Sequence, residues 1–267
     1  NYLNPNFNLN LVLIVENQVN NKNYNLAKEE LKKIPKNNLF YNWFKIKKTA
    51  SIIQEEEGKE KALKYIKKNF NLIKNSNNKI SFEMANILRN FEDYNNAIDM
   101  YTSLIKDNNF SKAEYADILY KRGTCYERIK NYTNADNDFE KSLKIVPDEP
   151  YVLNYLGYSW LERSFKIDDA MRMLKEAYQL KSNDPYITDS IGWAYFMVND
   201  FENSKKYLQK AVILMPYDPI VNDHYGDVLW KMGNKIQARY FWSSVLKFDD
   251  ADKEIKEKIK TKLTFGL

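Results

Sequence analysis

The stretch PYITDSIGWAYFMVNDFENSKKYLQKAVILMPYD, residues 185–218, contains the pattern that decides the fold. Asp184 precedes Pro185, and an N-cap residue followed by proline at the first helical position is a typical helix start. Small and apolar side chains recur at helical spacing on both sides of a turn at residues 199–200, and Pro216 ends the pattern. The stretch therefore predicts a helix, a short turn and a second helix.

The same unit recurs along the chain. One series of small residues, with separations of 35, 35, 38, 35, 34 and 34, consists of Ala27, Ala62, Ala97, Ala135, Ala170, Ser204 and Ala238. A second series, with separations of 34, 35 and 34, consists of Gly123, Gly157, Gly192 and Gly226. One small residue in each helix lets the two helices of a pair approach closely. A period near 34 therefore predicts an all-α array of helix-turn-helix repeats.

The unit resembles the tetratricopeptide repeat (TPR) at the positions that characterise this family. In residues 185–218 these positions hold Gly192, Tyr195, Leu208, Ala211 and Pro216. In residues 116–149 they hold Gly123, Tyr126, Ala135, Phe139 and Pro147. The resemblance implies an all-α, right-handed superhelical solenoid of about seven helix-turn-helix units.

Four repeats follow the pattern clearly and three follow it in part. The clear repeats are residues 116–149, 150–184, 185–218 and 219–252. The earlier repeats, at about 8–42, 43–77 and 78–115, have Val15, Ala50 and Ala85 in place of the glycine. We therefore group residues 1–115 as degenerate repeats and 116–252 as clear ones. Residues 253–267 are expected to form a capping helix that covers the open edge of the last repeat.

Composition limits the function. The 267 residues carry a formal net charge of +5, without the concentrated basic run that is typical of a nucleic-acid binder. The single cysteine, Cys125, excludes an internal disulfide and is expected to be a small semi-buried side chain. No apolar run approaches the roughly twenty residues that span a bilayer. The chain opens on an asparagine-rich stretch without methionine, so we expect a fragment of a longer precursor.

The sequence favours a non-catalytic protein. His224 is the only histidine, and it neighbours Asp223 and Asp227. A stable metal site needs three or four convergent ligands, and further histidine or cysteine ligands are absent nearby. No glycine-rich phosphate loop or nucleophile motif occurs. We therefore expect no enzyme activity, no cofactor and no metal.

The expected binding surface is the concave wall, which the TPR resemblance implies is lined by the first helix of each repeat. The candidate residues are Tyr151, Asn154, Tyr158, Tyr186, Asp189, Trp193, Phe196, Asp223, Asp227 and Trp230. Aromatic rings bury a large area at a small entropic cost, so they suit a groove that binds a protein or peptide. The aspartates are expected to select basic or amide groups of the partner. The alternative is that Trp193 and Trp230 pack only between adjacent repeats.

The last three repeats have a narrower resemblance. The segments DSIGWAYF, NDHYGDVLW and QARYFWSSVL, within residues 150–267, are similar to proteobacterial TPR proteins, often envelope lipoproteins, some of which are adaptors for processing proteases. The lysine and asparagine clamp of TPR arrays that bind chaperone tails is missing: its positions hold Tyr120 and Thr124, Asn154 and Tyr158, then Asp189 and Trp193. We therefore expect a protein-binding scaffold or adaptor in the bacterial periplasm or envelope, with the cytoplasm as the alternative compartment. A structural or self-associating module and an RNA-binding helical repeat are the alternative functions.

Overall fold

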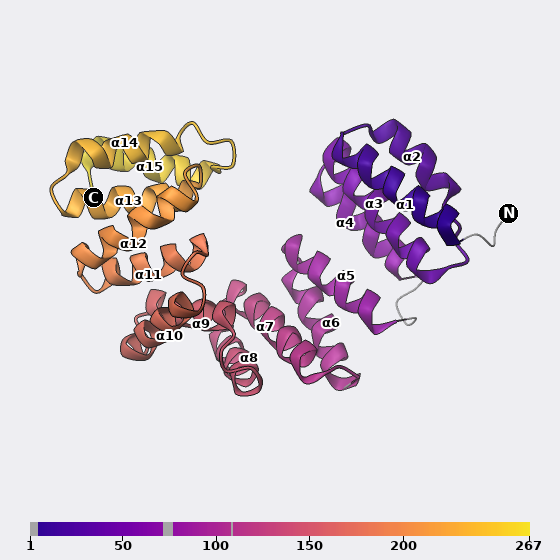
Figure 1. The fold of residues 1–267 in the computed structure, drawn as a ribbon, viewed down its shortest axis with the longest axis horizontal. Helices are drawn as coiled ribbons and strands as arrows, with labels where there is room; N and C mark the ends of the chain where they lie inside the picture. The colour runs from indigo at the N-terminus through magenta and orange to yellow at the C-terminus, as the bar shows by residue number, and fades with distance from the viewer. Residues whose placement is uncertain (1–4, 72–76, 108) are drawn as a thin grey trace. The chain divides into compact units, whose positions relative to one another are not determined.

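The computed structural model describes residues 5–71, 77–107 and 109–267, and these residues form fifteen α-helices (Figure 1). The first seven are α1 (Pro5–Asn20), α2 (Tyr24–Lys33), α3 (Leu39–Glu57), α4 (Lys59–Phe70), α5 (Asn78–Asn90), α6 (Tyr94–Asp107) and α7 (Lys112–Arg128). The others are α8 (Tyr132–Ile145), α9 (Pro150–Glu162), α10 (Ile167–Leu180), α11 (Pro185–Met197), α12 (Phe201–Leu214), α13 (Pro219–Lys231), α14 (Lys235–Val245) and α15 (Lys253–Phe265). The expected all-α fold is confirmed.

The chain falls into two compact units, residues 1–135 and 136–267. In the first unit α1 packs on α2, α3 on α4 and α5 on α6, while α7 packs against α6. In the second unit α9 packs on α10, α11 on α12 and α13 on α14, and α11 also contacts α9 and α13. The sequence suggested a grouping at residue 115, whereas the compact units divide inside α8. The end of the expected repeat 43–77, at residues 72–76, lies outside the described residues.

Small residues lie where the helices of a pair meet. The seven residues of the first series, Ala27, Ala62, Ala97, Ala135, Ala170, Ser204 and Ala238, are all fully buried. A Cβ added at Gly192 would lie 2.8 Å from the Leu208 side chain, and one added at Gly226 would overlap the Trp242 ring. The short period in the sequence therefore reflects steric limits on the distance between paired helices.

Local signals set the ends of the helices in the second unit. Asp184, Asp218 and Asp252 cap α11, α13 and α15 by accepting hydrogen bonds from backbone N–H groups of the first turn.

In most helix pairs of both units, the turn places a residue at positive φ two positions before the second helix begins. This residue is Lys22, Glu92, Lys130, Asn199 or Gly233.

The longer turn between α9 and α10 holds two such residues, Ser164 and Lys166.

Two further features bear on chemistry. Cys125, on α7, is fully buried, and burial raises the pKa of its thiol to about 11. Among the helices of the described residues, none is both long enough and apolar enough to cross a membrane.

Candidate protein-binding surface

The candidate residues come from α9, α11 and α13, the first helices of three successive pairs. Each of these helices begins with proline after a capping carboxylate, so equivalent positions stay in register. The two exposed candidates are Tyr151 and Tyr186. The half-buried ones are Asn154, Tyr158, Trp193, Phe196 and Trp230. The buried ones are Asp189, Asp223 and Asp227. The surface is therefore graded from exposed tyrosines to enclosed carboxylates.

Three rings are stacked where α11 meets α13. Trp193 lies parallel to Phe196, with ring centroids 4.6 Å apart and an interplanar angle of 10°. Its ring also stacks on His224 at 4.0 Å and 13°. The Trp193 Nε1 donates a hydrogen bond of 3.0 Å to Glu162 on α9. Contacts from three helices thus fix the orientation of a half-exposed tryptophan.

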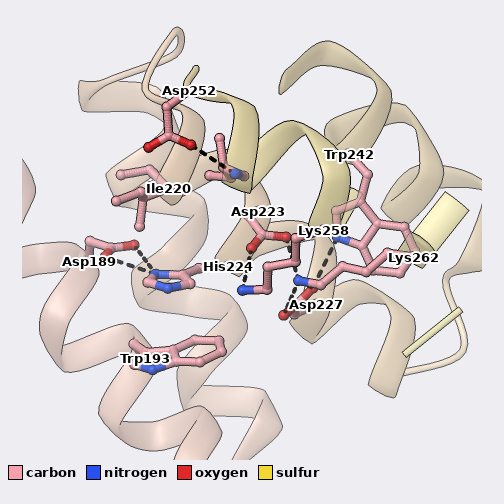
Figure 2. A network of polar contacts seen from close by, with 12 residues as sticks. Asp189, Trp193, Ile220, Asp223, His224, Asp227, Trp242, Asp252, Lys258 and Lys262 are labelled. Atoms are coloured by element: carbon pink, nitrogen blue, oxygen red, sulfur yellow. Dashed lines mark hydrogen bonds and ion pairs between the residues drawn. The ribbon is translucent and has the colours of Figure 1, made fainter. Parts of the chain in front are cut away.

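His224 joins this stack to a buried carboxylate. Its Nδ1 lies 3.1 and 3.0 Å from the two carboxylate oxygens of Asp189, and both residues are buried (Figure 2). Burial alone would lower the pKa of His224, but the carboxylates of Asp189, Asp223 and Asp227 raise it above its ordinary value. The imidazole is therefore favoured in its protonated form, as the counter-charge of Asp189.

The carboxylates of α13 face cations of α15. Lys262 Nζ lies 2.5 Å from Asp223 and 2.6 and 2.7 Å from the two oxygens of Asp227 (Figure 2). Lys258 lies 3.0 Å from Asp223, and Trp242 Nε1 donates to Asp227 at 3.0 Å. Burial, together with the Asp223 charge, raises the pKa of Asp227. The result is a buried polar cluster that joins α13, α14 and α15.

This arrangement differs from the expectation for the three aspartates. Asp189, Asp223 and Asp227 were expected to select groups on a partner. In the structure each is buried and already paired with a basic side chain, Asp189 with His224 of α13 and the other two with lysines of α15. A buried carboxylate without such a pair would be strongly unfavourable, which is the physical reason for their inward position.

Trp230 is also partly covered. Its ring packs on Trp242 at 5.3 Å, and a Cβ added at Gly266 would overlap it, so the backbone after α15 lies against the indole. Trp193 and Phe196 of α11 are half-exposed as well. The most exposed candidate ring is Tyr186 at the start of α11, at 62%.

Comparison with known proteins agrees with this architecture. A family model described as "Tetratricopeptide repeat" matches residues 116–149, the first clear repeat expected from the sequence. Residues 116–149 match the repeat itself, and the chain has the fold of a TPR solenoid. Over 114 residues, 43% of its length, it is 31% identical to the TPR repeat-containing protein PA4667 of Pseudomonas aeruginosa. The match spans only 19% of PA4667.

Solved structures of TPR proteins share the fold of this chain. The TPR protein TTC0263 of Thermus thermophilus has a TM-score of 0.60 at 14% identity, and the match covers 71% of this chain and all of that one. A TPR protein from Parabacteroides merdae also has a TM-score of 0.60, at 15% identity, with 83% and 87% of the chains covered. For Pseudomonas aeruginosa PilF the TM-score is 0.57 at 16% identity, covering 70% of this chain and 87% of PilF.

Sequence reasoning missed His224, Lys258 and Lys262 as partners of the carboxylates. The sequence does contain a signal for them. Asp189 and His224, Asp223 and Lys258, and Asp227 and Lys262 are all separated by 35 residues, which is one repeat length plus one. In these three cases the acid and the base lie side by side, on α11 and α13 or on α13 and α15.

The polar cluster gives no sign of metal binding. Within residues 5–71, 77–107 and 109–267, no three His, Cys, Asp or Glu side chains are placed to hold a metal ion. Three of the charged groups nearest to His224 are carboxylates already paired with cations of the chain. The arrangement suits charge balance between helices.

Proposed function

We propose that this chain binds a protein segment along α9 and α11, the first helices of two successive pairs. TPR arrays are generally protein–protein interaction modules and usually non-catalytic. Tyr158, Trp193 and Phe196 serve as apolar anchors, with the exposed Tyr151 and Tyr186 at the edge. The observation that carries this proposal is the stacked pair Trp193 and Phe196, which is half-exposed on the helix that also carries the exposed Tyr186.

The chemistry of recognition differs from what the sequence suggested. Because the three aspartates are paired within the chain, a basic partner gains little from them. Burial of partly exposed rings instead provides the main attraction, since aromatic side chains dominate interface energetics and lose little conformational entropy. The bound segment is therefore expected to present apolar or aromatic side chains to α11.

A selection from a random peptide library tests this proposal. The full chain is expected to enrich peptides whose affinity falls at least about tenfold when Trp193 and Phe196 are both replaced by alanine. The matched control is Tyr240→Ala on α14, which removes a ring that is 69% exposed and lies away from this surface. Circular dichroism must show equal helicity of the variants. Enrichment of no peptide, or equal affinity for the double variant, would contradict binding at α11.

The finer version of the proposal is an envelope-associated adaptor that presents the segment to a processing protease or an envelope complex. Its support is the resemblance over residues 150–267 and the bacterial origin of the relatives, PA4667 among them. Fractionation of the source cell tests this version. Recovery of the protein in the cytoplasm alone would exclude an envelope role and leave the binding proposal intact.

A structural, self-associating role is the second candidate, because several large apolar side chains are exposed near the start of α11 and α13. These are Tyr186 at 62%, Tyr217 at 78% and Ile220 at 53%. Exposed apolar patches of this kind mark contact surfaces. A mass that rises with protein concentration in sedimentation would favour this role, and a constant monomer mass would exclude it.

A further inference from the structure

His224 completes the charge balance of a cluster that reaches the proposed binding surface. Three carboxylates lie in the cluster, on Asp189, Asp223 and Asp227. The cations Lys258 and Lys262 provide two positive charges. Only a protonated imidazole makes the number of positive charges equal to the number of carboxylates. The same ring stacks on Trp193, which the proposed function uses as an anchor.

We propose that proton binding at His224 controls the aromatic face of α11, because the imidazolium holds both Asp189 and Trp193 in the observed arrangement. Loss of the proton weakens both contacts. The proton acts on the site of the proposed function, and the inference rests on that function only for its effect on binding. The surface then binds its segment more tightly when His224 is protonated.

Charged and aromatic groups of α11, α13 and α15 surround His224 and support this role. Asp189 of α11 faces Nδ1, and Trp193 of the same helix covers the ring. From its own helix, the charges of Asp223 and Asp227 act on the imidazole. On α15, Lys258 and Lys262 face those two carboxylates. Glu162 of α9 accepts the hydrogen bond of the Trp193 indole.

Deprotonation of His224 weakens its contacts with both Asp189 and Trp193. The ion pair with Asp189 becomes a hydrogen bond from a neutral imidazole, so a buried carboxylate loses its counter-charge. The favourable contact between a cation and the face of Trp193 is lost as well. Both changes loosen the junction of α11 and α13, where Trp193 and Phe196 are held.

Nuclear magnetic resonance of the full chain tests the proposal without any partner. The chain has a single histidine, so its imidazole signals need no separate assignment. The pKa of His224 is expected to lie above the ordinary value of 6.5, because the carboxylates favour the charged form. The indole N–H signal of Trp193, identified with Trp193→Phe, is expected to shift with the same midpoint.

Two variants test the cause of that midpoint. Asp189→Asn keeps the shape of the side chain and is expected to move the pKa of His224 down toward 6.5. Asp250→Asn removes an equal charge at an exposed position and is expected to leave this pKa unchanged.

A third variant tests the coupling to the ring stack. His224→Phe keeps a ring against Trp193 and is expected to abolish the shift of the Trp193 signal. A wild-type pKa at or below 6.5, equal effects of the two Asp variants, or a Trp193 signal that still shifts in His224→Phe would overturn the proposal.

The binding arm uses a peptide selected for α11. Its affinity is expected to fall several-fold as pH rises through the midpoint of His224, and to show no such step in His224→Phe. An affinity that is independent of pH would overturn control of the surface. If the selection yields no peptide, the proposed function fails while the imidazole and indole titrations still decide whether the proton is coupled to the stack.

Discussion

At the residue scale, a glycine of α9, α11 and α13 lies against the second helix of its pair with little or no space for another carbon. Gly226 of α13 faces Trp242, whose indole donates to Asp227 and is fully buried. Gly157 of α9 is less crowded, since an added Cβ would lie 3.0 Å from Ala170 O and Leu174 Cγ. The cost of a methyl group should therefore depend on which neighbour it meets.

Gly226→Ala is expected to destabilise the protein by about 1–3 kcal/mol through overpacking, offset in part by the better helix propensity of alanine. Gly157→Ala is the matched control and is expected to cost less, because the Leu174 side chain can move more easily than the Trp242 ring. Thermal unfolding followed by circular dichroism measures the difference. Equal stability of Gly226→Ala and the wild type would contradict the close contact of α13 and α14.

The buried ion pairs of Lys262 lead to a second residue-scale prediction. Lys262→Gln leaves Asp223 and Asp227 buried without their shared cation, and breaking such a pair typically costs about 3–5 kcal/mol. Lys260→Gln, on the same helix, removes an exposed pair with Glu257 and is expected to cost under about 0.5 kcal/mol. Denaturant unfolding separates the two outcomes. A loss in Lys262→Gln as small as in the control would show that α15 is not held by this cluster.

At the element scale, the junction of α11 and α13 should give the protein a pH-dependent stability. The pKa of His224 is raised in the folded state, so its contribution to stability is fully present below its unfolded pKa of about 6.5 and is lost as pH rises through the folded value. The free energy of unfolding is expected to fall across this range. His224→Gln should lack this component in denaturant titrations between about pH 6 and 9. A wild-type stability that rises with pH there would contradict the pairing with Asp189.

The helices themselves could be predicted from the sequence, whereas the pairing of the carboxylates could not. Proline and a capping carboxylate mark the starts of α9, α11 and α13, and the small residues fix the period, so local and steric signals agree for these helices. Asp223 and Asp227 read as surface groups because the helix that covers them, α15, lies outside the repeat pattern. The position of Lys262 follows only once α15 is placed where another repeat would begin. In the turns, Lys130 and Asn199 adopt positive φ, which the repeat pattern does not indicate.

At the scale of the whole molecule, the effect of a destabilising substitution is expected to reach only the neighbouring helix pairs. Each pair in residues 136–267 contacts the next, so a defect in one pair weakens its neighbours most. Gly226→Ala is therefore expected to speed hydrogen exchange in α12 to α15 while α3 to α6 exchange as in the wild type. Hydrogen exchange with peptide-level mass spectrometry measures this. Uniformly faster exchange in both regions would mean that the chain unfolds as a single unit.

The enclosed thiol of Cys125 has a practical consequence for the whole molecule. With the thiolate disfavoured by burial and no second cysteine in the sequence, the native protein is expected to react slowly with maleimide reagents. A cysteine introduced at any exposed site would then carry a fluorophore or spin label alone. The wild-type chain is thus already a background for site-specific labelling, without the removal of a native residue.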